Sequence, residues 1–196
     1  ERAIEEKADA IFVHHGVFWD NESKTISGAK RAKIALLLKH NINLFGFHLP
    51  LDDHDEVGNN VELGRRLGIK NMEPVAGGLL WQGDLNTNIS DFSKLIEEKL
   101  DRAPQVFGKQ SGKIKKISWC TGAAQGFIED AINLNVDLYL SGEVSEKTPA
   151  VAKENNITFI SAGHHATERY GVQALCKHLC SQFKLQHHYI EVDNSV

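Results

Sequence analysis

Histidine is the residue type whose number and placement point to chemistry in this chain. The 196 residues include ten histidines, and six of them form three adjacent pairs. Two pairs, His14-His15 and His164-His165, follow apolar runs that predict strands. The segment from His48 to His54 also follows an apolar run and contains two aspartates. Because imidazole and carboxylate ligands suit zinc, iron, manganese or cobalt, we expect a metal site at these strand ends.

The spacing of these side chains allows either two metal ions or one ion reached by a bend in the chain. Adjacent residues of a strand point to opposite faces, so His14 and His15 cannot face one ion unless the chain bends, for example at Gly16. His164 and Glu168 are four residues apart and share a face if a helix begins there. A carboxylate can bridge two ions, and ions roughly 3.5–4 Å apart can activate one water for hydrolysis.

Four histidines lie outside these clusters, and we interpret them as surface or hydrogen-bonded core residues. They are His40, His178, His187 and His188. The same interpretation is the better one for any histidine taken alone. It is the recurrence of clusters at several strand ends that favours metal binding.

The elements that must position these residues alternate between strand and helix. The pattern predicts strands over 10–14, 42–48, 114–120, 137–141, 157–161 and 185–192, and helices over 28–40, 58–67, 90–101, 123–134, 147–155 and 165–183. A looser segment is expected over 71–88. Strands that alternate with helices and are apolar on both faces predict an α/β fold with largely parallel sheets and three-layer character. Ligands of such sheets bind beyond the carboxyl ends of the strands.

A faint internal repeat predicts two related halves that face a shared metal cleft. Ala131-Ile132 followed by Asp137 and a strand resembles Ala3-Ile4 followed by Asp9 and a strand, and a second match follows in the same order. The halves are expected at about 1–70 and 113–196, joined by a short connecting segment over 71–112. The first seven residues are typical of a helix end, which predicts that residues precede them; a frayed start is the alternative.

Composition excludes several classes of protein. The length suits one compact unit, and the net charge of −4 provides no global positive field for nucleic acid. No apolar run is long enough to cross a bilayer. The three cysteines, Cys120, Cys176 and Cys180, are odd in number and lack CxxC spacing, which predicts reduced thiols in or near the core. We therefore expect a cytoplasmic protein.

Two further segments are weaker candidates for the site. Thr121 and Gly122 lie between a predicted strand and helix, where free backbone N–H groups could bind a substrate phosphate; tight packing explains them equally well. Glu143 occupies the position in the repeat that corresponds to His15. It is a candidate general base or a partner of a metal ligand, and the alternative is a carboxylate stabilised by a helix N-terminus.

Two groups of basic residues are most simply solvated faces. They are Lys109, Lys113, Lys115 and Lys116, and Lys30, Arg31, Lys33 and Lys39. A groove for nucleotides or single-stranded nucleic acid is the alternative, but no aromatic residues are interleaved with them to stack on bases.

Four motifs, in order along the chain, resemble the Nif-three-like family of dinuclear metal-binding proteins, whose members are often called GTP cyclohydrolase 1 type 2 homologues. The motifs are VHHG with Phe18-Trp19, HLPLD followed by Gly58-Asn59-Asn60, SGEVSE, and AGHHATE. The resemblance covers essentially the whole chain. It implies that the metal ligands are His14, His15, Asp52, His164 and Glu168.

The resemblance also carries expectations about architecture and assembly. It implies two related α/β halves and a ring-shaped homohexamer. It implies that the family's first few dozen residues, with an opening strand, are absent here. The 71–112 segment is too short for the large domain that some relatives insert between the halves.

The predicted function is a dinuclear metal-dependent hydrolase that acts on a nucleotide or another phosphorylated small molecule. GTP cyclohydrolase activity is what the resemblance implies, and no residue by itself selects guanine. The alternative is a non-catalytic, metal-stabilised oligomeric adaptor or nucleic-acid-associated module. Open coordination positions would favour the enzyme, and saturated ions would favour the adaptor.

Overall fold

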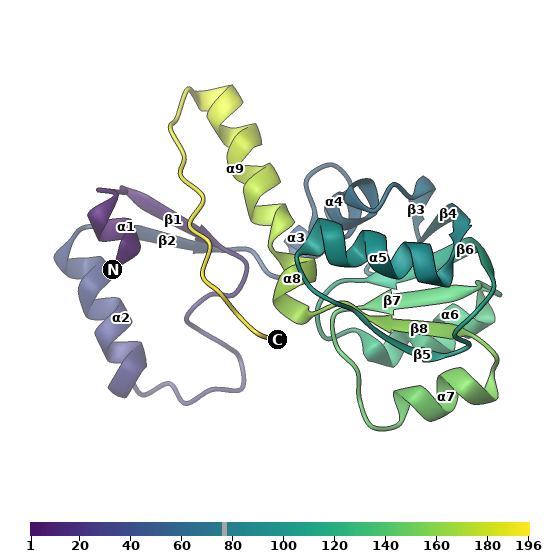
Figure 1. Cartoon of the computed structure of the whole chain (residues 1–196). Coiled ribbons are helices and arrows are strands. Elements are labelled where there is room, and N and C mark those ends of the chain that lie inside the picture. The colour runs from purple at the N-terminus through teal and green to yellow at the C-terminus, as the bar shows by residue number, and fades with distance from the viewer. Residues whose placement is uncertain (76–77) are drawn as a thin grey trace.

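The computed structural model describes residues 1–75 and 78–196, which form two α/β parts of unequal size (Figure 1). In the smaller part, β1 (Ala10–Val13) pairs in parallel with β2 (Asn43–Gly46). The chain passes from β1 to β2 through α2 (Gly28–Lys39), and α1 (Arg2–Glu5) precedes β1. Because β1 and β2 run in the same direction, residues that follow both strands emerge at one edge of this small sheet.

The larger part is built on a mixed sheet of the order β3-β4-β6-β7-β8-β5, as described over the same residues. Its strands are β3 (Lys70–Pro74), β4 (Trp81–Asn88), β5 (Gln105–Gly108), β6 (Lys113–Cys120), β7 (Leu138–Ser141) and β8 (Thr158–Ser161). The three central strands β6, β7 and β8 run parallel. The outer strands β3, β4 and β5 pair antiparallel with their neighbours. The sheet is therefore parallel where the chain alternates between strand and helix.

Helices cover both faces of this sheet and give it three layers (Figure 1). The remaining elements are α3 (Leu49–Asp52), α4 (Asn59–Arg66), α5 (Ile89–Leu100), the 3₁₀ turn η1 (Gln125–Phe127), α6 (Ile128–Asn133), α7 (Thr148–Glu154), α8 (His164–Glu168) and α9 (Tyr170–Phe183). One core packs α4 and α5 against β6 and β7, and the other packs α6 and α7 against β7 and β8.

Strand β7 shows why the sequence folds this way. Leu138 and Leu140 belong to the core beneath α4 and α5, whereas Tyr139 belongs to the opposite core. All three are fully buried, as expected for a continuous apolar run covered on both faces. The prediction of an α/β fold with three-layer character is confirmed, and the larger sheet is mixed because its outer strands pair antiparallel.

Three strands of the larger sheet were not predicted, because outer strands have weaker apolar patterns than central ones. The segment expected to be loose over 71–88 contains β3 and β4, which pair antiparallel, and its Gly77 lies outside the described residues. Strand β5 was not predicted. Both β3 and β5 lie at edges of the sheet; β3 is largely exposed, and β5 has only four residues, three of them half-buried, so the apolar pattern of each is weak or short. Pro74 is tolerated in β3 because an edge strand has one unpaired side.

The predicted strand over 185–192 was wrong, because this segment pairs with no described strand. Side-chain contacts hold it instead, including one between His165 Nε2 and Glu191 Oε1 at 2.7 Å. The predicted helix over 165–183 divides into α8 and α9, and the one over 123–134 begins as η1 before α6.

The three cysteines lie in or near the core, as the sequence predicted. Cys120, Cys176 and Cys180 are free thiols; Cys120 is buried, and the other two are half-buried on α9. Among the described residues, no helix combines the length and apolar character needed to cross a membrane.

Candidate metal centre

The structure brings five of the sequence-predicted side chains together between the two parts of the molecule. His14 and His15 directly follow β1, Asp52 ends α3, and His164 and Glu168 begin and end α8. Because β1 and β2 are parallel and α3 follows β2 within a few residues, the histidine pair and Asp52 lie at the same edge of the small sheet. Three separate chain segments therefore supply one cluster.

Glu168 lies at the centre of this cluster. Its Oε2 atom is 2.8 Å from His164 Nε2 and 3.2 Å from His15 Nε2. The same oxygen is 3.5 Å from His14 Nε2, and that nitrogen is 3.3 Å from Asp52 Oδ2. One carboxylate therefore faces three imidazole rings, and a second carboxylate faces one of them.

These side chains form two triads that overlap at Glu168. The ligand atoms of His14, Asp52 and Glu168 lie within 4.8 Å of one another, and so do those of His15, His164 and Glu168. Each triad has the nitrogen and oxygen donors that borderline divalent ions prefer. A single shared carboxylate is the arrangement in which one residue can bridge two ions.

Buried polar atoms at the centre of the cluster support a cation. His14 Nε2, His164 Nε2 and Glu168 Oε2 are buried and have no hydrogen-bond partner in the described part of the chain. His164 Nε2 and Glu168 Oε2 are close, but they are not aligned for a hydrogen bond. Bound divalent ions would satisfy all three atoms, so these residues fit a metal.

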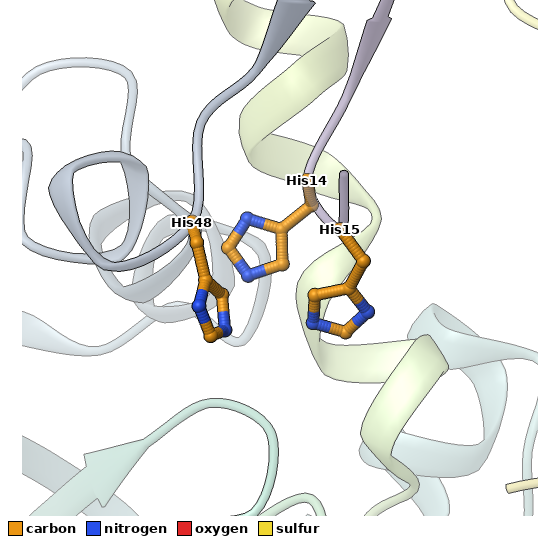
Figure 2. Close-up of side chains that lie close together, drawn as sticks. All are labelled: His14, His15 and His48. Carbon is orange, nitrogen blue, oxygen red and sulfur yellow. The ribbon is translucent and has the colours of Figure 1, made fainter. Parts of the chain in front are cut away.

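The chain bends before the position that the sequence suggested. Strand β1 ends at Val13, and the bend lies at His14 and His15 rather than at Gly16. The two rings consequently lie side by side with centroids 4.7 Å apart and planes tilted by 40° (Figure 2). The Nδ1–H of His14 donates to Phe47 O at 2.9 Å, which leaves Nε2 free to bind a metal.

Two adjacent asparagines orient Asp52, although sequence reasoning gave them no role. Asn59 Nδ2 donates to Asp52 Oδ1 at 2.8 Å, and Asn59 Oδ1 accepts the Gly171 N–H at 2.7 Å. Asn60 Nδ2 donates to the Asp52 carbonyl at 3.2 Å. With Oδ1 held in this way, Oδ2 faces His14. The sequence shows two asparagines directly after Gly58, but it does not show which groups they contact.

Glu143 contacts a candidate ligand rather than the centre of the cluster. Its Oε1 atom lies 2.6 Å from His164 Nδ1, and the His164 Nε2 atom faces Glu168. A carboxylate on the outer nitrogen of a metal-binding histidine fixes the ring and strengthens it as a ligand. Of the alternatives for Glu143, this geometry favours a partner of a metal ligand.

Electrostatic coupling within the cluster is strong when no metal is bound. Contact with Glu168 raises the pKa of His164 to about 9, against the effect of burial, and Glu143 adds to the increase. Burial acts to raise the pKa of Glu168, but His15 and His164 outweigh it and lower that pKa to about 2. The carboxylate is therefore ionised at neutral pH, as metal binding requires.

Gly122 has a steric role beside this cluster. Its φ of +66° is a conformation that side chains rarely adopt, and a Cβ atom here would collide with Glu168 Oε1. The N–H groups of Thr121 and Gly122 already donate to Asn60 Oδ1 and Thr167 Oγ1, each at 3.0 Å. This geometry favours the packing interpretation of the segment over a phosphate site.

His48 also lies near the cluster. The sequence analysis placed it in a candidate segment but did not single it out as a ligand. It follows β2, and its ring lies 5.0 Å from that of His14 and 5.1 Å from that of His15 (Figure 2). The three rings also form a group whose nitrogen atoms lie within 4.8 Å of one another. Its position at a strand end, at the start of the HLPLD motif, was a usable signal.

The other histidines, as far as the described residues extend, belong to none of these groups. His40, His178 and His187 are exposed on the surface, and His188 Nδ1 lies 3.4 Å from Glu6 Oε2. This agrees with their interpretation as residues outside the site.

The fold and this cluster together define an α/β protein with a candidate metal centre between its two parts. Residues 1–195 match the family described as Duf34/NIF3 (NGG1p interacting factor 3). The chain belongs to this family.

Curated relatives and solved structures agree with that assignment. The chain is 48% identical over 198 residues to the "GTP cyclohydrolase 1 type 2 homolog" of Allochromatium vinosum, covering 99% of this chain and 78% of the relative. It is 46% identical over 195 residues to the Neisseria meningitidis protein of the same name, covering 98% and 78% of the two chains. The solved structure of protein ybgI, described as of unknown function, matches with a TM-score of 0.94 and 39% identity over 100% of this chain and 80% of that one. The Thermus thermophilus protein TTHA1606 matches with a TM-score of 0.89 and 29% identity over 100% and 79%.

Proposed function

We propose that this chain is a metal-dependent hydrolase that holds two divalent ions and acts on a nucleotide or another phosphorylated small molecule. The observation that carries the proposal is the shared carboxylate of Glu168, which belongs to both triads. The buried, unpartnered atoms His14 Nε2, His164 Nε2 and Glu168 Oε2 support it. The name GTP cyclohydrolase 1 type 2 homolog, carried by relatives at 48% and 46% identity, supports the nucleotide as substrate class.

The roles of the residues follow from their contacts. Asp52 and His14 would hold one ion, His15 and His164 the other, and Glu168 would bind both. When bound, a pair of divalent ions activates water near neutral pH and stabilises the charge that develops in the displacement. Asn59 keeps Asp52 Oδ2 directed at His14, and Glu143 keeps the His164 ring in place. The donors suit zinc, iron, manganese or cobalt.

Isosteric substitution of the carboxylates tests this function. Asp52→Asn and Glu168→Gln keep side-chain volume but remove the negative charge that holds dications. Both variants should lose metal-dependent hydrolysis across a panel of nucleotides and phosphoesters. His187→Ala, an exposed histidine outside the groups, should keep activity within a few-fold.

The alternative function, a metal-stabilised adaptor, predicts a different result from the same proteins. In that case chelation or either carboxylate variant would lower the oligomer mass in light scattering, and no substrate in the panel would be hydrolysed. Hydrolysis that added metal restores after chelation would support the enzyme. Its absence, together with the loss of mass, would contradict the enzyme.

A further inference from the structure

Trp19 differs from the other two tryptophans because its indole ring is partly open to solvent. Trp81 and Trp119 are 3% and 0% exposed and pack against each other in the core. Trp19 is 42% exposed and lies in the segment between β1 and α2. Exposing a large aromatic ring forfeits burial that the core tryptophans gain. Its location at the cluster supplies a reason for the exposure.

The indole ring lies directly against two histidines of the candidate metal centre. Its centroid is 5.4 Å from that of His15, with planes at 57°, and 5.1 Å from that of His48, with planes at 77°. Both contacts are tilted or edge-on. Among the described residues no aromatic ring stacks flat on the indole, and the exposed part of its surface remains open to a planar ligand.

His48 adds a polar group to the same location. Its ring touches those of Trp19, His14 and His15. Within the described part of the chain, its imidazole makes no hydrogen bond or ion pair, unlike the rings of His14 and His164, whose Nδ1 atoms are both engaged. An unengaged imidazole beside an open indole offers one hydrogen-bonding group next to one stacking surface.

We propose that Trp19 and His48 form a substrate subsite that takes a planar heteroaromatic ring, with the indole stacked on the ring face and the imidazole bonded to its edge. This inference rests on the proposed function, since it names the part of the substrate that lies beside the ions. Aromatic side chains stack on heteroaromatic bases because both have extended π faces, and the contact tolerates different bases. The subsite therefore selects for a ring and does not by itself select guanine.

Fluorescence provides a test that does not depend on turnover. Since Trp81 and Trp119 are buried, a ligand at this subsite should quench mainly the emission of Trp19. The metal-loaded protein is titrated, by rapid mixing, with guanosine monophosphate, adenosine monophosphate and ribose 5-phosphate. Both nucleotides should quench the emission and bind more tightly than ribose 5-phosphate, which shares the phosphate but has no base.

Substitutions test whether Trp19 and His48 are the residues that bind the ring. Trp19→Ala should weaken nucleotide binding, measured by calorimetry, roughly 5- to 150-fold, the range for loss of one base–aromatic stack. Trp19→Phe keeps a stacking ring and should recover most of the affinity. Phe183→Ala removes a 68% exposed aromatic ring at the far end of α9 and should change nothing. His48→Ala should weaken nucleotide binding but leave the number of bound metal ions unchanged.

Three results would overturn the subsite. Equal affinity for nucleotides and ribose 5-phosphate in wild type and Trp19→Ala would show that no ring is bound there. A lower oligomer mass in Trp19→Ala would show that the indole lies in an interface between copies of the chain. Loss of a metal ion in His48→Ala would show that His48 is a ligand and not part of the subsite.

Failure of the subsite can be distinguished from failure of the proposed function. Metal-dependent hydrolysis of phosphoesters, with no dependence on a ring, would contradict the subsite and leave the hydrolase intact. Ring-dependent quenching without hydrolysis of any substrate would contradict the hydrolase and leave the subsite intact.

Discussion

Replacing Asn59 with alanine should destabilise the fold and weaken metal binding together. Asn59 is fully buried, and its amide joins Asp52 Oδ1 to the Gly171 N–H. Its loss removes a hydrogen bond to a charged group, worth about 1.5–3 kcal/mol, and leaves the buried Gly171 N–H without an acceptor, at about 1–3 kcal/mol. Thr121 Oγ1, 3.3 Å from Asp52 Oδ1, retains part of the first interaction. We therefore expect a loss of about 3–5 kcal/mol in the free energy of unfolding.

This loss of stability is large enough to measure in metal-free protein, separately from any effect on metal binding. For a chain of this length it corresponds to a fall in melting temperature of roughly 10 °C, followed by calorimetry on chelated protein. Metal affinity, measured by competition with a chromophoric chelator, should fall about 10- to 100-fold, the range for losing a residue that orients a ligand.

The same substitution elsewhere in the chain provides the control. Asn88 caps α5 by accepting the Asp91 N–H at 3.0 Å, and it lies far from the cluster in sequence and in the sheet. Asn88→Ala should cost about 1 kcal/mol and leave metal affinity unchanged. If Asn59→Ala behaved like Asn88→Ala in both assays, the idea that Asn59 positions Asp52 would be refuted.

Two further predictions concern steric fit and pH. Gly122→Ala places a Cβ atom against Glu168 Oε1 at a φ of +66°, so metal affinity should fall at least about ten-fold. The control is Gly126→Ala, where a Cβ meets nothing within 4 Å and metal binding should be normal. Equal metal affinities of the two variants would contradict the steric argument. In metal-free protein the pKa of His164 is raised from 6.5 to about 9, so its contribution to stability is fully present below pH 6.5 and is lost as the pH rises through about 9. The melting temperature of chelated wild type should therefore fall relative to that of His164→Gln between these values, and parallel curves would contradict the coupling.

Much of the fold could be predicted because its central elements have strong apolar patterns. Strand β7 is buried on both faces and follows a polar helix end, so its location is visible in the sequence. Strands β3 and β5 were missed because they are edge strands with weak or short patterns: β3 is largely exposed, and β5 has only four residues, three of them half-buried. The 185–192 segment has strand-forming residues but pairs with none of the described strands, and pairing partners are not encoded locally.

The candidate site, like the fold, could be predicted from the sequence only in part. Histidines after apolar runs could be found from local pattern, since strands of an α/β fold end at a common edge. The overlap of both triads at Glu168 depends on how α8 meets the end of β1, which is a tertiary contact. The positions of Asn59 and Trp19 could not be predicted for the same reason: their partners, Gly171 and His48, are distant in sequence.

The number of metal ions bound per chain tests the central claim most directly. Metal-free protein is dialysed to equilibrium against zinc, manganese or cobalt, and the bound metal is measured by elemental analysis against protein concentration. The two triads that share Glu168 predict close to two ions per chain in wild type and no more than one in Glu168→Gln. A value near one or below in wild type, unchanged by excess metal, would contradict the account.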